Sequence, residues 1–219
     1  CPSGTVTAKG KGAGFLAEPQ KLDQFLDQIF SKLDMKISIK TRIGTHYEED
    51  WEYLLAIYEK YPIHELIIHP RIQTDMYRGV PRLGAYEKAV NRLKMPLCYN
   101  GNLFSAADYK RITERFPDTC CFMYGRGLIT NPGLVTEIRE GIRPNKKTVR
   151  EFHDCLFEEY RELLSGERNV LFRMKELWSY MAVNFTNYEK YAKKIKKSQH
   201  LSEYSSVVSS LFAEQDLID

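Results

Sequence analysis

The chain has 219 residues, of which 43% are hydrophobic and 28% are charged. This is the composition of an ordinary folded protein, and it excludes a disordered, collagen-like or disulfide-dense chain. The formal net charge of +3 is too small to argue by itself for a nucleic acid partner. No apolar run approaches the roughly 18–20 residues that a membrane span needs, so we expect no membrane segment.

The five cysteines are odd in number, and no two of them form a C-x-x-C pair. They give little support to a zinc or thioredoxin-type motif, and we predict no metal site. Free thiols without a secretory signal indicate the reducing cytoplasm. Because the chain begins with Cys1 and not with Met, we interpret it as a processed chain or a piece of a longer one.

Strand and helix patterns alternate along the first 140 residues. Alternating hydrophobic residues or short apolar runs predict strands at 35–41, 65–69, 96–100 and 119–125. Helical spacing of apolar residues predicts helices at 19–33, 51–58, 83–94, 105–115 and 131–140. Strands that alternate with helices indicate a parallel sheet with crossover helices.

The spacing of the predicted strands favours a (β/α) barrel. From Lys40 to His69, Asn100 and Gly125 the steps are 29, 31 and 25 residues. Eight strand–helix units normally take about 250 residues, so four units predict half a TIM (β/α)8 barrel, here over residues 1–145. A doubly wound sheet is the alternative. Residues 146–219 carry only helical patterns, which predict an all-α bundle domain.

Polar or glycine-containing triplets end all four predicted strands. They are Lys40-Thr41-Arg42, His69-Pro70-Arg71, Asn100-Gly101-Asn102 and Gly125-Arg126-Gly127. Barrel enzymes place their chemistry at these strand ends and bind phosphate after the last two strands, where glycine lets backbone N–H groups approach. Lys40 and His69 can donate hydrogen bonds to a ring or carbonyl, while Arg42 and Arg71 suit a polyanionic substrate. Flavin mononucleotide (FMN) is therefore the natural cofactor.

Two further segments suggest function. Residues 186–197 hold five lysines and one glutamate, interleaved with Tyr188 and Tyr191. Such a helix can lie along RNA phosphates through Lys193 and Lys194, although a solvated lysine face is the plainer interpretation. A thiol at a strand end, as predicted for Cys1, can act as an acid or a nucleophile.

In motif order, residues 1 to about 135 resemble the tRNA-dihydrouridine synthases. The G-C-P-x-x-x-V loop of that family is similar to residues 1–6, its K-x-R motif to 40–42 and its G-R-G motif to 125–127. Its H-G-R and N-G-D motifs are similar to the triplets that end the second and third strands. Pro70 and Asn102 depart from those two motifs.

The resemblance implies an oxidoreductase that reduces uridine in tRNA to 5,6-dihydrouridine, with NADPH reducing FMN and hydride passing from the flavin to C6 of the uracil. The cysteine matching Cys1 gives a proton to C5. Lys40 and His69 contact the flavin ring, and the residues near its phosphate are Asn100, Gly101, Asn102, Gly125 and Arg126. The residues expected to contact the substrate are Arg42, Arg71, Lys193 and Lys194.

By the same resemblance the chain carries strands 5–8 of the family barrel, followed by the tRNA-binding helical domain. We therefore expect the 219-residue chain alone to bind FMN poorly and to have little activity. Two other functions stay open: an FMN-barrel oxidoreductase acting on a small molecule, and a non-catalytic RNA-binding relative. The basic helix counts against the first, and the complete set of strand-end residues counts against the second.

Overall fold

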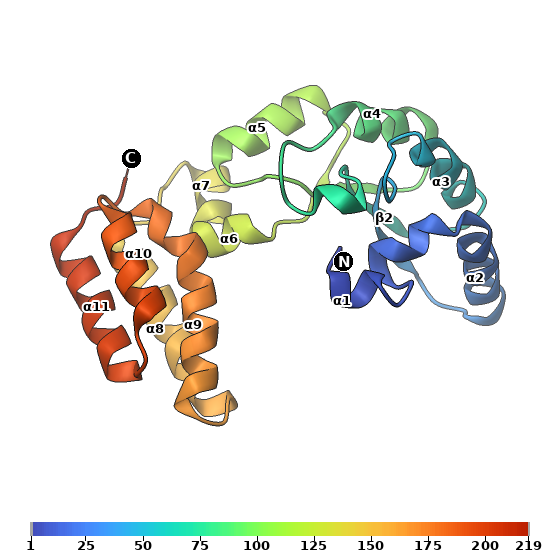
Figure 1. The fold of residues 1–219 in the computed structure, drawn as a ribbon. Coiled ribbons are helices and arrows are strands. Elements are labelled where there is room, and N and C mark those ends of the chain that lie inside the picture. The colour runs from blue at the N-terminus through green and yellow to red at the C-terminus, as the bar shows by residue number, and fades with distance from the viewer. Residues whose placement is uncertain (1, 219) are drawn as a thin grey trace. The chain divides into compact units, whose positions relative to one another are not determined.

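The computed structural model describes residues 2–218, so Cys1 lies outside the described residues. The chain forms two compact units (Figure 1). The first contains the chain up to Asn102 together with Arg111–Met123, and the second contains Leu103–Lys110 and the chain from Tyr124 onward. No helix in residues 2–218 combines the length and the apolar character that a membrane crossing requires.

A four-stranded parallel sheet forms the centre of the first unit, with its strands in the order β1-β2-β3-β4. The strands are β1 (Ser38–Arg42), β2 (Glu65–His69), β3 (Leu97–Tyr99) and β4 (Cys121–Phe122). The prediction of an α/β fold with a parallel sheet is confirmed. The last two strands are shorter than the sequence pattern suggested, because few of their residues pair with a neighbour.

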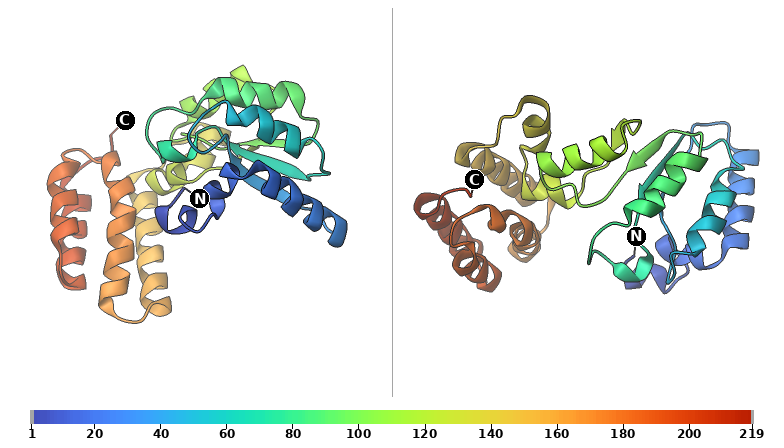
Figure 2. Two further views of the ribbon diagram at one scale, coloured as in Figure 1. Left: turned by 45° about the vertical axis from the view of Figure 1, so that its right-hand side comes forward. Right: turned by 90° about the horizontal axis from the view of Figure 1, so that it is seen from above.

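Helices α2, α3 and α4 lie side by side along this sheet (Figure 2). The helical elements of the unit are α1 (Gly4–Thr7), η1 (Gly12–Ala17), α2 (Pro19–Lys32), α3 (Asp50–Tyr58), η2 (Gln73–Asp75), α4 (Leu83–Arg92) and α5 (Ala106–Arg115), the last shared with the second unit. Hydrogen bonds reinforce the apolar packing: the Tyr58 hydroxyl lies 2.8 Å from Thr41 Oγ1, and Trp51 Nε1 donates to the Ala85 carbonyl. Both aromatic side chains are buried.

The second unit is helical. Its elements are α6 (Arg126–Thr130), α7 (Leu134–Glu140), α8 (Lys146–Leu163), α9 (Glu167–Met181), η3 (Ala182–Asn184), α10 (Tyr188–Lys197) and α11 (Leu201–Glu214). Helices α8–α11 fall within residues 146–219, where the sequence carries only helical patterns, and α8 begins where Asn145 Oδ1 accepts from Thr148 N–H as an N-cap. The short helix α6 was not predicted. Contacts group residues 124–145 with the second unit, so a domain boundary at 145 stays a prediction.

A buried polar network lies inside the core of the second unit. Trp178 Nε1 donates to the Tyr204 hydroxyl at 2.7 Å, and that hydroxyl lies 2.6 Å from His153 Nε2. The Asp154 carboxylate only accepts, so His153 Nδ1 carries a proton and donates to Asp154 Oδ1 at 2.8 Å. In the neutral ring Nε2 is then the acceptor of the Tyr204 hydroxyl proton. The network therefore suits a neutral imidazole.

We expect the stability of this unit to fall below about pH 6.5. Burial lowers the pKa of His153 from its ordinary value of 6.5, although Asp154 acts in the opposite direction. Above pH 6.5 the ring is neutral in both folded and unfolded chains. As the pH falls from 6.5 towards the lowered pKa, the unfolded chain takes up a proton that the folded chain does not, so the free energy of unfolding decreases.

Urea-induced unfolding of the 219-residue chain between about pH 5.5 and pH 7.5 measures this effect, in a range where ordinary carboxyl groups stay ionised. The variant His153→Gln provides the control, since its side chain does not titrate. An identical pH dependence in the variant and the parent chain would contradict the assignment to His153.

Candidate active site at the strand ends

The ends of β1 and β2 bring the first two predicted triplets together. Arg42 is paired in register with His69, and Lys40 lies two residues earlier on the same face of β1. The Lys40 side chain is exposed to solvent. The surrounding strand ends nevertheless desolvate its ammonium group and lower the pKa of Lys40, and the charge of Arg42 adds to this effect. Lys40 is thus an accessible cation that holds its proton less tightly than an ordinary lysine.

His69 is buried beside Arg71, with the two side chains in direct contact. Its Nε2 lies 3.0 Å from Arg71 Nη1. A guanidinium group only donates hydrogen bonds, so Nε2 must be the acceptor. We therefore assign the neutral tautomer with the proton on Nδ1. The Tyr77 ring packs against the imidazole, with the two ring centroids 6.3 Å apart.

The two predicted substrate arginines hold the loop after β2. Arg71 is 0% exposed and donates from Nε to the Arg78 carbonyl and from Nη2 to the Gly79 carbonyl. Arg42 is 5% exposed; it donates to the Ile72 carbonyl at 2.8 Å and also to that of Met76. Both guanidinium groups therefore organise residues 72–79. Their predicted contact with the substrate stays a prediction.

Sequence patterns missed the residues of this loop. Asp75 accepts from the Ile72 N–H at 3.1 Å and forms an ion pair with Arg82, which also reaches Glu48 at 3.1 Å. Tyr77 is half exposed, and its ring lies 5.4 Å from the Arg42 guanidinium carbon. The available signal was positional: a long loop after a strand of a parallel α/β sheet is where such folds place functional groups.

The third triplet joins the same cluster. Asn100 Nδ2 donates to the Met123 carbonyl at 2.7 Å, which links the chain after β3 to the chain after β4. Asn102 Oδ1 accepts from Arg71 Nη2 at 3.2 Å. Asn102 has a left-handed backbone conformation (φ 44°) that asparagine tolerates well. Asparagine therefore fits the local backbone at this position, where the N-G-D motif has an aspartate. A Cβ at Gly101 would lie 3.0 Å from the Pro81 ring.

The fourth triplet belongs to the second unit. Gly125 precedes α6, and the guanidinium carbon of Arg126 lies 5.4 Å from the centre of the Phe104 ring. Gly127 lies against the backbone of Leu103, where a Cβ would stand 1.9 Å from the carbonyl oxygen. Gly127 therefore has a packing role that its place in a phosphate motif did not indicate.

We expect Gly127→Ala to lower the free energy of unfolding by about 1–3 kcal/mol, because the added methyl group must displace the Leu103 backbone or α6. Thermal and urea unfolding of the 219-residue chain measure the loss. Gly84→Ala is the control: it lies in helix α4 with no atom within 4 Å of the added Cβ, and alanine favours a helix. Equal effects of the two variants would contradict the proposed clash.

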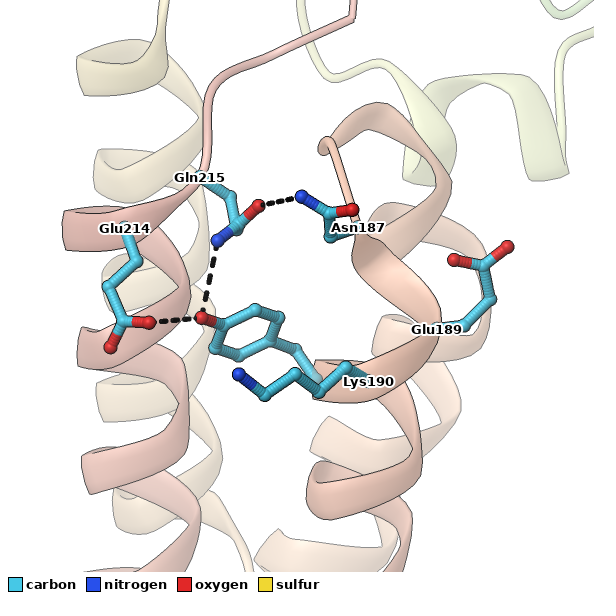
Figure 3. Close-up of a pocket in the computed structure, with 6 residues that line it drawn as sticks. Asn187, Glu189, Lys190, Glu214 and Gln215 are labelled. Atoms are coloured by element: carbon cyan, nitrogen blue, oxygen red, sulfur yellow. Dashed lines mark hydrogen bonds between the residues drawn. The ribbon is translucent and has the colours of Figure 1, made fainter.

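The basic helix α10 presents its lysines to solvent. Tyr191 and Ile195 are buried, whereas Lys193 and Lys194 are exposed. Beside this helix lies a polar pocket of about 510 Å³ (Figure 3). The Tyr191 hydroxyl donates to Glu214 at 2.5 Å and accepts from Gln215 at 3.3 Å. These contacts fix α10 against the end of α11 and leave the two lysine head groups in water.

Polar side chains gathered at the carboxyl ends of a parallel sheet are typical of α/β enzymes. A model of the family described as dihydrouridine synthase (Dus) matches residues 1–215. The chain belongs to this family.

Curated relatives agree with this assignment. The chain is 26% identical to the "Probable tRNA-dihydrouridine synthase 1" of Synechocystis sp. over 231 residues, which cover 100% of this chain and 60% of that protein. It is 24% identical to tRNA-dihydrouridine synthase B of Vibrio vulnificus, covering 78% of this chain and 52% of that protein. It is 26% identical to tRNA-dihydrouridine(16) synthase of Shewanella oneidensis, covering 83% of this chain and 58% of that protein. The chain thus spans little more than half the length of these relatives.

Proposed function

We propose that this chain is part of a flavin-dependent enzyme that reduces uridine in tRNA to 5,6-dihydrouridine. The observation that carries the proposal is the placement of Lys40 and His69 on the same face of the sheet, at the adjacent ends of β1 and β2, in a member of the dihydrouridine synthase family. The proposed architecture is the C-terminal half of a TIM barrel, built on β1–β4, followed by a helical tRNA-binding domain over residues 146–219.

The donor set at the strand ends fits FMN. Lys40 offers an accessible ammonium group, and in the assigned tautomer His69 carries its N–H on Nδ1. An oxidised or reduced flavin ring carries carbonyl oxygens and ring nitrogens that accept such donors. When bound and reduced by NADPH, FMN supplies the hydride that adds to C6 of the uracil.

The residues of the chain position the reactants in this proposal. Lys40 and His69 donate hydrogen bonds to the edge of the flavin ring, and Arg71 fixes the tautomer of His69. The phosphate is assigned by family resemblance to Asn100, Gly101, Gly125 and Arg126, whereas the side chain of Asn102 is engaged by Arg71. Cys1 gives a proton to C5 of the uracil, and Arg42 shapes the loop that carries Tyr77.

Lys193 and Lys194 are the proposed contacts to tRNA phosphates. In residues 2–218 neither lysine forms an ion pair with an acidic side chain, so both charges are available to a polyanion. Each phosphate contact that is lost should reduce the salt dependence of RNA binding by about one unit of slope.

The test is genetic. Cells lacking the gene that encodes this chain should lose dihydrouridine at one or more tRNA positions, and the intact gene should restore it. The variant Lys40→Met should fail to restore the modification, while Lys36→Met, an exposed lysine just before β1, should restore it. Unchanged dihydrouridine content after deletion would refute the proposed reaction, and full restoration by Lys40→Met would refute the role of Lys40.

A further inference from the structure

Three potential metal ligands meet in the first unit, beside the strand-end residue Lys40. The Glu65 carboxylate and the Sγ atoms of Cys98 and Cys121 offer ligand atoms that all lie within 4.8 Å of one another. Cys98 is buried, and the other two side chains are partly exposed. The cluster is therefore both preassembled and reachable from solvent.

Sheet register explains why these side chains converge. Cys98 pairs with Cys121 across β3 and β4, and Ile67 pairs with Cys98 across β2 and β3. Paired residues of parallel strands point to the same face, and Glu65 shares the face of Ile67 because it lies two residues earlier. Three neighbouring strands thus each contribute one ligand to the same face of the sheet.

The geometry is close to what zinc requires. With Zn–S bonds of about 2.3 Å in a tetrahedral arrangement, two thiolate ligands lie about 3.8 Å apart. The ligand atoms of the cluster lie within 4.8 Å of one another, so changes of side-chain torsions are enough to bring them onto one ion. Two cysteines and one carboxylate also form a donor set of the sulfur and oxygen types that zinc accepts, with a fourth position left for water.

The charges of the site also favour a divalent cation. With both thiols ionised, the three ligands carry a charge of −3, and a divalent ion leaves −1. Lys40 lies in the same row of the sheet, paired in register with Ile67, and offsets this remaining charge. Cysteine binds zinc as the thiolate, so metal binding releases protons and depends on pH.

We propose that Glu65, Cys98 and Cys121 form a binding site for one Zn²⁺ ion on this face of the sheet. The site adjoins Lys40, whereas His69 and Asn100 lie two residues further along their strands than Ile67 and Cys98. Zinc binding does not depend on the proposed reaction.

The test is a metal titration of the purified, reduced 219-residue chain under anaerobic conditions. Zinc binding is measured in competition with a chromophoric chelator, and cobalt is used as a spectroscopic substitute. We expect one equivalent of zinc per chain, release of protons on binding, and a sulfur-to-cobalt charge-transfer band from the two thiolates.

The variants Cys121→Ser and Glu65→Gln remove ligands that are only partly buried, so their folding can be verified by circular dichroism. Removing a residue that only hydrogen-bonds a metal ligand weakens metal binding by about 10–100-fold. Removing a ligand itself should weaken binding at least as much. Cys120→Ser and Cys155→Ser are the matched controls, since both thiols are exposed and lie outside the cluster.

Three results would overturn the proposal. The first is no stoichiometric zinc or cobalt binding by the reduced chain. The second is binding that Cys120→Ser weakens as much as Cys121→Ser does. The third is a cobalt spectrum without a thiolate band. None of these measurements depends on turnover of tRNA, so the metal site and the proposed enzymatic function can fail independently.

Discussion

Replacing Arg71 with methionine should destabilise the first unit by on the order of 3 kcal/mol, because each buried acceptor left without a donor costs about 1–3 kcal/mol. The Arg71 side chain is 0% exposed and satisfies the carbonyl groups of Arg78 and Gly79, Asn102 Oδ1 and His69 Nε2. Urea-induced unfolding measures the loss. Hydrogen exchange should show that protection decreases most in residues 65–80 and around Asn102.

Arg78→Met is the matched control, since Arg78 lies in the same loop with an exposed side chain and contributes only its backbone carbonyl to Arg71. It should change the free energy of unfolding by less than about 0.5 kcal/mol. Arg71→Lys should recover only part of the loss, because an ammonium group lacks the planar fork that reaches several acceptors at once. An Arg71→Met protein as stable as the Arg78→Met protein would show that the loop does not depend on this guanidinium.

Tyr204→Phe should lower the stability of the second unit by about 2–4 kcal/mol. The substitution removes one hydroxyl and keeps the ring, but it leaves two buried partners, Trp178 Nε1 and His153 Nε2, without a hydrogen bond. The loss should exceed that of an ordinary buried tyrosine with one partner. Thermal unfolding followed by circular dichroism and by tryptophan fluorescence provides the measurement.

Tyr180→Phe is the comparison within α9, since the Tyr180 hydroxyl forms no hydrogen bond in residues 2–218 and its removal should be nearly neutral. The double variant Tyr204→Phe, His153→Phe replaces both hydrogen-bonding groups and should recover part of the loss, because one unsatisfied group disappears. Equal stability of the two single variants would rule out the buried network as a stabilising element.

Helices and strands of this chain were predictable because their signals are local. The apolar stripe from Trp51 to Tyr58 has helical spacing and forms α3, and the alternation around Ile39 forms β1. The polar triplets at the ends of β1, β2 and β3 also lie together in the first unit, as the parallel sheet requires. Such predictions need only a repeat in the sequence and the direction of the strands.

The roles of several site residues were not predictable because they depend on partners far away in the sequence. Arg42 and Arg71 have the residue type of substrate contacts, which stays a prediction, but nothing in the sequence indicates that they also donate to carbonyl groups of residues 72–79. No periodic pattern marks that loop. The role of Gly127 likewise follows from the approach of the Leu103 backbone, which the G-R-G motif does not encode.

The cysteines also show that sequence patterns do not reveal contacts between residues far apart in the chain. A search for closely spaced pairs finds no metal motif, because Cys98 and Cys121 are 23 residues apart in the sequence. They become neighbours only through the register of β3 and β4, which places them directly opposite each other. Spacing rules describe ligands on one turn or one helix, whereas ligands on adjacent parallel strands are separated by a whole crossover helix.

The order in which segments enter the two units has a consequence for biosynthesis. Residues 103–110 of the second unit are made before residues 111–123, which include β4 of the first. Until Phe122 has left the exit tunnel, β3 is the open edge of the sheet; afterwards the edge is β4, whose two residues offer little backbone for pairing. An open edge strand is a template for pairing with other chains. Pausing of translation just before β4 should make the nascent chain prone to aggregation and dependent on chaperones.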